Sequence, residues 1–180
     1  MDLYVSLAKS AVENWIEKNT VIFPPANLPR EFFERKAGVF VTIEKEGKLR
    51  GCIGTYLPTK ENIAKEIISN AIAAATEDYR FLPVQREELP YLSYTVSILS
   101  RPEQIKNLEE LDPKKYGIIV RTFSLEEPHK TQKAGLLLPD LQGVDTIEKQ
   151  ISIACQKGGI NPKREKIVIY RFTVEKHQKE

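Results

Sequence analysis

The order of strand-like and helix-like segments constrains the fold of this sequence more than any other feature. Residues 38–44 (GVFVTIE) are rich in β-branched and aromatic side chains, and residues 49–56 (LRGCIGTY) follow as the returning strand of a hairpin. An alanine-rich helix is expected over residues 60–78, with Thr59 as its cap. Residues 92–100 alternate between apolar and polar side chains, as half-buried antiparallel strands do. The first half of the chain therefore predicts strand, strand, helix, strand.

The second half repeats this order. Strands are expected over residues 117–123 (GIIVRTF) and 134–138 (AGLLL), and a helix over residues 146–157 ends at Gly158 and Gly159. Residues 166–174 (KIVIYRFTV) form the last expected strand. Another amphipathic helix precedes both repeats. The pattern predicts an α+β fold with at least six strands, mainly antiparallel, and flanking helices.

The domain organisation follows from the same repeat. The opening helix is expected over residues 4–18, where apolar residues recur at steps of three and four. No Gly/Ser-rich or Pro-rich linker separates the halves, so residues 1–180 are expected to form a single domain of two similar lobes, about 1–105 and 106–180. The polar tail, residues 175–180, is expected to be frayed.

Composition and charge exclude several classes of protein. The apolar fraction of 41% and charged fraction of 29% are ordinary for a globular chain. A net charge of +2 does not indicate the strongly basic surface that a nucleic-acid-binding protein needs. No apolar run is long enough to span a membrane, and the first ten residues lack the pattern of a signal peptide. We therefore expect a cytoplasmic protein in which Cys52 and Cys155 are free thiols.

Familiar catalytic and cofactor motifs are missing from the sequence. It contains no Walker loop, G-x-G-x-x-G, C-x-x-C, H-E-x-x-H or G-x-S-x-G, and its two histidines are His129 and His177. No metal site is expected, and the sequence names no cofactor.

The segment that stands out is Leu49-Arg50-Gly51-Cys52-Ile53-Gly54. In a regular strand, Arg50 and Cys52 share a face and Leu49 lies on the other, toward the core. Gly51 and Gly54 would leave space around the thiol, and a nearby cation favours the thiolate. The segment equally fits a structural role, with Cys52 as a small buried residue and Arg50 as a surface charge. Spacing alone favours this structural role.

Two further segments carry polar groups at element ends. Asp78-Tyr79-Arg80-Phe81-Leu82-Pro83 follows the alanine-rich helix, and it could line a pocket or simply end the helix. Pro139 follows the strand at 134–138, where it could turn toward a site or only terminate the strand. We expect Cys52, Arg50, Asp78 and Arg80 to lie together in space.

These segments resemble the AMMECR family. The resemblance rests on GVFVTI, LRGCIGTY, the alanine-rich helix that ends in D-x-R-F-x-P, GLLLP and K-G-G-I, and it runs from about Tyr4 to Val174. The resemblance implies an α+β fold with a curled, mainly antiparallel sheet. It also implies a site assembled from Arg50, Gly51, Cys52, Gly54, Asp78, Arg80, Phe81 and Pro139.

The bacterial branch of this family, system protein A of a three-gene cluster, implies a Memo-like protein and a radical-SAM protein as partners. Two functions are then open. In one, the protein belongs to a modification or repair pathway, with a small-molecule or peptide pocket around Cys52 as nucleophile or ligand and Arg50 as anion clamp or thiolate stabiliser. In the other, it is a non-enzymatic adaptor whose signature strand is a docking surface. The absence of a histidine near Cys52 in the sequence favours the adaptor, whereas the concentration of polar residue types favours the pocket.

Overall fold

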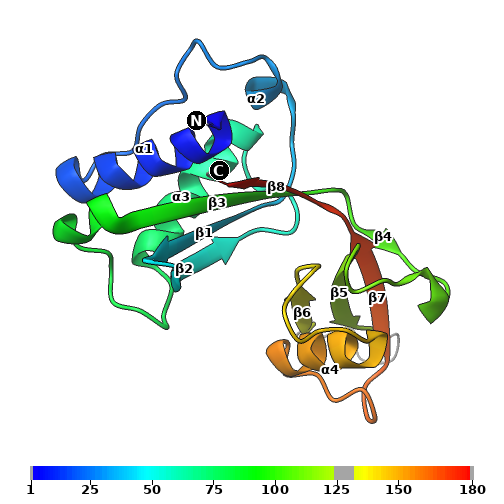
Figure 1. The fold of residues 1–180 in the computed structure, drawn as a ribbon. Helices are drawn as coiled ribbons and strands as arrows, with labels where there is room; N and C mark the ends of the chain where they lie inside the picture. The colour runs from blue at the N-terminus through cyan, green and yellow to red at the C-terminus, as the bar shows by residue number, and fades with distance from the viewer. Residues whose placement is uncertain (1, 124–131, 179–180) are drawn as a thin grey trace. The chain divides into compact units, whose positions relative to one another are not determined.

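The fold is described from a computed structural model, which covers residues 2–123 and 132–178 (Figure 1). The chain divides into two compact units. The first comprises residues 1–99 and 175–180, and the second comprises residues 100–174. Each unit has its own four-stranded sheet with helical cover.

The sheet of the first unit has the strand order β2-β1-β3-β8. These strands are β1 (Val39–Lys45), β2 (Lys48–Gly54), β3 (Leu92–Leu99) and β8 (Val174–Gln178). Strand β1 pairs antiparallel with both β2 and β3, and its Thr42 lies opposite Cys52 on one side and Thr95 on the other. Strand β2 is therefore an edge strand.

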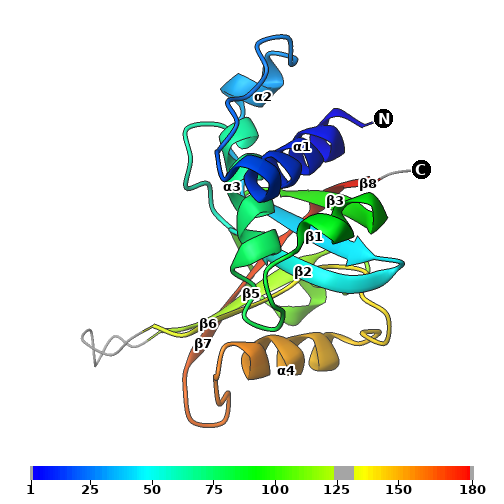
Figure 2. The ribbon, with the colours of Figure 1, turned by 90° about the vertical axis from the view of Figure 1, so that its left-hand side faces the viewer.

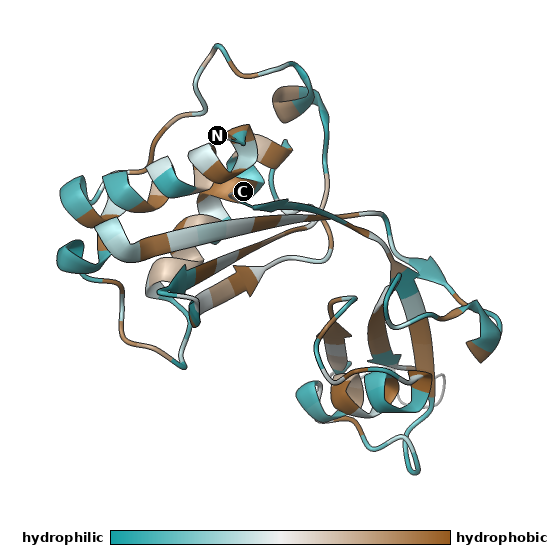
Figure 3. Cartoon of the chain, in the orientation of Figure 1, coloured by the Kyte–Doolittle hydropathy of each residue, from teal (hydrophilic) through white to brown (hydrophobic). Residues whose placement is uncertain are grey.

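Two long helices, α1 (Leu3–Lys18) and α3 (Ile63–Thr76), cover one face of this sheet (Figure 2). Buried side chains from both helices meet Val39, Val41 and Ile43 of β1 in a continuous core. Helix α1 alternates between hydrophilic and hydrophobic stretches along its length, as a single buried stripe requires (Figure 3). The short helices α2 (Glu31–Glu34) and η1 (Arg86–Tyr91) complete the unit.

The sheet of the second unit has the order β4-β7-β5-β6. Its strands are β4 (Glu103–Gln104), β5 (Gly117–Thr122), β6 (Ala134–Leu137) and β7 (Ile167–Phe172), and every pairing among them is antiparallel. Helix α4 (Ile147–Lys157) packs on β5 and β6, and the 3-10 helix η2 (Leu108–Glu110) follows β4. Ala154 and Cys155 of α4 are buried in a core with Ile118 and Val120.

The two units have equivalent topologies. Strands β1-β2, helix α3 and strand β3 correspond to β5-β6, α4 and β7, and the fourth strand of each sheet pairs with the third in both units. Gly51 of β2 and Gly135 of β6 also correspond, because an added Cβ would lie 2.1 Å from the Ala74 carbonyl oxygen in α3 and 1.8 Å from the Ala154 carbonyl oxygen in α4. The repeated order of elements is therefore accompanied by the same close contact between a strand glycine and a helix carbonyl in both units.

The predicted α+β class with antiparallel sheets and flanking helices is confirmed, with eight strands in the described residues. Two local predictions are wrong. Asn62, not Thr59, caps α3, because Thr59 instead donates to the buried carboxylate of Glu66. The polar tail is not frayed over residues 175–178, because it forms β8 beside β3 and His177 contacts Asp2 and Glu175. Among the described residues, no helix is long and apolar enough to cross a membrane.

Candidate functional site

The edge of β2 is joined to the loop after α3 by one carboxylate. The backbone N–H of Cys52 donates to Asp78 Oδ2 at 2.9 Å, which satisfies a strand amide that has no neighbouring strand on that side. Asp78 follows the end of α3 and is only 5% exposed. Its position explains why an acid is needed directly after the helix, since a shorter or apolar side chain would leave the edge amide buried and unpaired.

Arg80 holds the same carboxylate from the other side. Its Nε and Nη2 donate to Oδ1 and Oδ2 of Asp78 at 2.9 and 2.7 Å, and its backbone N–H donates to Oδ1 at 3.2 Å. The hydrogen bond from Arg80 lowers the pKa of Asp78 to about 2, and the hydrogen bond from the Cys52 amide adds to this shift. The carboxylate is therefore ionised and saturated with donors.

A second ion pair lies on the same edge. Arg50 donates through Nε and Nη2 to Glu88 of η1 at 3.0 and 2.9 Å, and Lys45 Nζ donates to the same carboxylate at 3.0 Å. The hydrogen bond from Arg50 lowers the pKa of Glu88 to about 2. With 15% of its side chain exposed and its fork filled by Glu88, Arg50 is a structural cation.

A β-bulge explains the direction of Arg50. The neighbouring residues Ile43 and Glu44 pair with Gly51 and Leu49, so Arg50 is the extra residue in β2. The bulge also places Leu49 opposite Glu44, and Leu49 is 42% exposed. The prediction that Leu49 points into the core with Gly51 is therefore wrong, because simple alternation does not continue through a bulge.

Phe81 lies between the two arginines. Its ring centroid is 5.8 Å from Cζ of Arg50 and 5.6 Å from Cζ of Arg80, within the range of cation–π attraction. The aromatic ring thus joins the Asp78–Arg80 pair to the Arg50–Glu88 pair, and the loop over residues 77–83 is fixed at three points. Tyr79 and Leu82 of this loop are 95% and 83% exposed.

The two glycines of the signature strand do not open space around the thiol, contrary to the expectation. A Cβ on Gly51 would collide with the backbone of α3, and a Cβ on Gly54 would lie 2.3 Å from Cγ of Phe40. Both positions need glycine because another group already occupies the space above them.

The thiol of Cys52 lies on the sheet face opposite the helices, beside β1. Its Sγ is 3.3 Å from Oγ1 of Thr42, and the residue is half-buried. The pKa of Arg80 is raised, first by Asp78 and further by the charge of a Cys52 thiolate, so the guanidinium is within electrostatic reach of the sulfur. Cys155 differs, because it is buried in α4 and burial raises its pKa.

The structure therefore brings Cys52, Asp78, Arg80, Phe81 and Arg50 into one network, and it adds two residues that the sequence did not single out. Neither Glu88 nor Thr42 belongs to a sequence motif. They are recognised only in the structure, where Glu88 of η1 binds Arg50 and Thr42 of β1 contacts Cys52. Pro139 belongs to the second unit, two residues after the end of β6.

His177, the histidine among the described residues, does not supply a base for Cys52. His177 has both ring nitrogens engaged, Nδ1 with Asp2 at 2.8 Å and Nε2 with Glu175 at 3.0 Å, and its ring packs 4.0 Å from that of Tyr4. His129 lies outside the described residues. The described residues also hold no group of three side chains placed to bind a metal ion.

Fold and site together define a small α+β protein of two ββαβ units, in which an ion-paired loop is fastened to a cysteine-bearing edge strand. This class has a known family: the AMMECR1 family model matches residues 5–177, and the chain belongs to that family.

Relatives and a solved structure agree with this assignment. A Thermotoga maritima protein is 51% identical over 176 residues, which cover 97% of both chains. A Clostridium acetobutylicum protein is 42% identical over 178 residues, and the match covers 98% of this chain but 36% of that longer protein. The crystal structure of an uncharacterized protein from Pyrococcus horikoshii superposes with a TM-score of 0.87 at 33% identity, covering 98% of this chain and 90% of that one.

Proposed function

We propose that this protein is a non-enzymatic adaptor, and that the loop over residues 77–83 beside β2 is its docking surface for a protein partner. The observation that carries the proposal is the contrast within this loop. Asp78 is buried and hydrogen-bonded to Cys52 and Arg80, while Tyr79 and Leu82 are 95% and 83% exposed. Exposed tyrosines are enriched among the residues that anchor protein interfaces, because the ring buries a large apolar area and its hydroxyl can still form a hydrogen bond.

The charges of the loop favour a protein partner that presents an apolar pocket, and they argue against an anionic ligand. Arg80 is neutralised by Asp78, and Arg50 and Lys45 share Glu88. The Nε and Nη2 donors of both guanidinium groups already bind a carboxylate, so neither arginine offers this pair of donors to a phosphate or carboxylate ligand. The expected partner therefore presents an apolar pocket for Tyr79 and Leu82, with contact area supplied by the neighbouring edge of β2.

The partners to test are the two that the family resemblance implies, a Memo-like protein and a radical-SAM protein. Each would be purified and titrated against this protein by isothermal calorimetry. We expect one of them to bind, and the double substitution of Tyr79→Ala and Leu82→Ala to weaken that binding by at least about tenfold. Phe23→Ala is the matched control, since Phe23 is an exposed aromatic (89%) elsewhere in the same unit and should leave the affinity unchanged. Equal loss in both variants, or binding by neither partner, would refute the proposal.

A thiol function is the second candidate, with Cys52 as nucleophile in a modification or repair pathway. Two observations favour it: the thiol is half-buried rather than part of the core, and the Arg80 guanidinium lies within electrostatic reach. Against it stands the neighbour of the sulfur, the hydroxyl of Thr42, which is a poor general base. Alkylation of the folded protein separates the two functions, as argued in the Discussion.

A further inference from the structure

We infer that strand β8 is held in the sheet of the first unit by a pH-sensitive clasp, in which the protonated ring of His177 bridges two carboxylates. One carboxylate is that of Asp2, at the start of α1, and the other is that of Glu175, on β8 itself. When the ring loses a proton the clasp weakens, and β8 loosens from the edge of β3. The inference does not depend on the proposed docking loop, which lies beside β2 at the other edge of the sheet.

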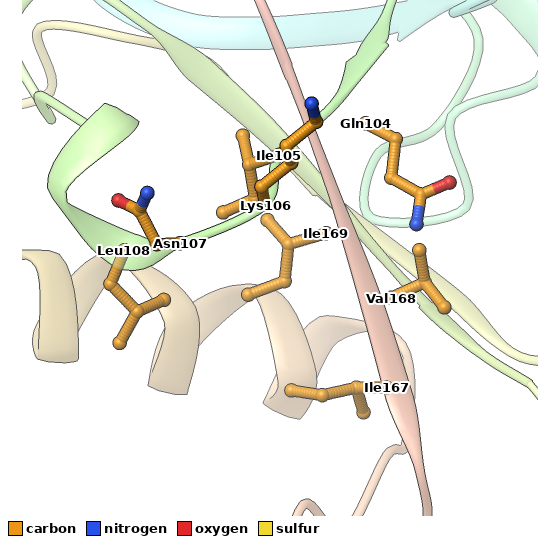
Figure 4. Close-up of a pocket in the computed structure, with 8 residues that line it drawn as sticks. All are labelled: Gln104, Ile105, Lys106, Asn107, Leu108, Ile167, Val168 and Ile169. Atoms are coloured by element: carbon orange, nitrogen blue, oxygen red, sulfur yellow. The ribbon is translucent and has the colours of Figure 1, made fainter.

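Strand β8 has no buried side chain to anchor it. Its sequence is VEKHQ, and all five residues are half-buried or exposed. The fourth strand of the second unit differs, because the chain that continues from β4 carries Ile105, which packs against the core that includes Ile169 of β7 (Figure 4). In the first unit, the contacts of polar side chains therefore contribute much of what holds β8 beside β3.

The ring of His177 is engaged at both of its nitrogens. Nδ1 lies 2.8 Å from Oδ2 of Asp2, and Nε2 lies 3.0 Å from Oε1 of Glu175. A neutral imidazole has one N–H donor and one bare nitrogen, whereas an imidazolium has two donors. Because ionised carboxylates only accept, both contacts are hydrogen bonds only when the ring carries two protons.

Both carboxylates are held in their ionised form by other donors. Oδ1 of Asp2 accepts two backbone N–H groups in the first turn of α1, at 2.8 and 3.1 Å, and Oε2 of Glu175 accepts Nη1 of Arg35 at 2.8 Å. Burial by itself raises the pKa of each acid, but the hydrogen bonds outweigh burial, so the pKa of Asp2 and the pKa of Glu175 are both lowered. The proton that the clasp can lose is therefore the one on His177.

The other neighbours of the ring also favour a cation. The ring of Tyr4 lies 4.0 Å from that of His177, and the face of an aromatic ring attracts positive charge. The Tyr4 hydroxyl donates to Glu31 at 2.9 Å, and burial together with this hydrogen bond raises the pKa of Tyr4 to about 12. Tyr4 therefore stays neutral, and Glu31 adds a third carboxylate to the two of the clasp. Deprotonation of His177 removes one of the positive charges that balance these acids.

Loss of the proton changes both contacts. The proton passes to water, and the nitrogen that it leaves turns a lone pair toward a carboxylate oxygen, so these two atoms repel. The contact that survives is weaker, because a neutral N–H donates a weaker hydrogen bond than an imidazolium. The ordinary charge change of histidine falls between about pH 5 and 8. The clasp thus stabilises β8 at the lower end of this range, and its contribution is lost as the pH rises.

Hydrogen exchange of the 15N-labelled full chain between pH 5.5 and 8 tests the clasp. Protection factors correct for the intrinsic pH dependence of exchange, and the ring 15N shifts of His177 report its protonation in the same samples. We expect the protection of residues 175–178 to fall about tenfold as the ring loses its proton, while residues 39–45 of β1 change little. The inference is overturned if the ring titrates without this fall, or if the fall occurs at a different pH from the ring titration.

Three variants assign the effect to the clasp. His177→Gln cannot carry a charge and should show the low protection of β8 at every pH. Asp2→Asn retains the helix cap, since asparagine caps as well as aspartate, but it removes one charge and should reduce the pH dependence. Lys176→Gln is the matched control, because Lys176 is an exposed residue of the same strand, and it should behave as the parent does. A His177→Gln protein whose β8 is as protected as that of the parent at pH 5.5, or still loosens with pH, would show that His177 is not the clasp.

Discussion

The amide of Cys52 and the carboxylate of Asp78 form the 2.9 Å link between the signature strand and the loop after α3. One oxygen of Asp78 accepts this amide and a guanidinium N–H, and the other accepts two further N–H groups of Arg80. The position of Tyr79 and Leu82 depends on this link, since both are in the segment that Asp78 fastens down. Sequence elements that are 26 residues apart thereby act as one surface.

Replacement of Asp78 by asparagine should uncouple the loop from β2. The side-chain NH2 of asparagine would replace one carboxylate oxygen in a site that holds only donors, so the two N–H groups that this oxygen accepts would lose their acceptor. We expect the free energy of unfolding to fall by about 2–4 kcal/mol, as measured by urea denaturation. Asp140→Asn is the control, because Asp140 is exposed in a turn and asparagine tolerates its positive φ of 56°. Equal stability of the two variants would contradict the anchoring role.

Acid should weaken the same edge. The folded-state pKa values of Asp78 and Glu88 are about 2, below the ordinary values of 3.8 and 4.5, owing first to Arg80 and Arg50. Because both values are depressed, their stabilisation is complete above about pH 5 and is lost as the pH falls toward 2. Each group contributes at most about 2–3 kcal/mol.

The check is the slope of unfolding free energy against pH in a single variant. Glu88→Gln should be less stable at pH 7 and should lose less stability than the parent protein between pH 5 and 2. Glu87→Gln, at the exposed neighbour, should keep the parent slope. A parallel slope in Glu88→Gln would show that Glu88 does not contribute to acid sensitivity.

Phe81 and Tyr79 should separate stability from binding. Phe81 is half-buried between two guanidinium groups, so Phe81→Ala should cost about 2–3 kcal/mol of stability. Tyr79 is 95% exposed, and Tyr79→Ala should change stability by less than about 0.5 kcal/mol while it weakens partner binding. Thermal unfolding and calorimetric titration of both variants measure the two effects. A loss of stability in Tyr79→Ala would mean that Tyr79 supports the fold instead of a partner.

The sequence predicted much of this architecture because hydrophobic periodicity is a local property. The helix predicted over residues 146–157 agrees with α4 (Ile147–Lys157), and the strand over 117–123 agrees with β5. Long-range features were not predictable in this way. The bulge at Arg50 depends on pairing with β1. Strand β8 is polar because it lies at a sheet edge, so its sequence cannot be told apart from that of a disordered terminus.

In the candidate site, too, local features could be predicted from the sequence and long-range contacts could not. Asp78, Arg80 and Cys52 could be grouped because their segments each place polar residues at the end of an element. Glu88 could not be found, since nothing in its own surroundings distinguishes it from Glu87, and only the fold brings it to Arg50. The glycines were visible but misinterpreted, because sequence cannot say whether the space above a glycine is empty or filled.

Gly51 and Gly135 provide a test of the internal repeat. Alanine at either position would bring a Cβ against a helix carbonyl, at 2.1 Å from Ala74 and 1.8 Å from Ala154. Since the obstacle is backbone, side-chain rotation cannot relieve it, and each substitution should cost about 2–3 kcal/mol or more. Lys48→Ala, at the exposed start of β2, should cost less than about 0.5 kcal/mol. Urea unfolding measures all three, and a neutral Gly135→Ala would show that the two glycines are not equivalent.

The thiol of Cys52 decides whether the second candidate function survives. Cys52 is half-buried on the sheet face opposite α1 and α3, and Cys155 is enclosed in α4, where burial raises its pKa. Thiolate is the reactive form, so iodoacetamide should modify Cys52 well before Cys155 in the folded protein.

Mass spectrometry at timed intervals measures both rates, and Cys52→Ser should remove the fast reaction while Cys155→Ser retains it. Thr42→Val removes the hydroxyl 3.3 Å from the sulfur and should alter the fast rate without unfolding the sheet. If Cys52 reacts only when urea unfolds the chain, the thiol has no access to a substrate in the native state. The nucleophile would then be lost from the pathway function, whereas the docking surface of Tyr79 and Leu82 would be untouched, because neither side chain depends on the sulfur.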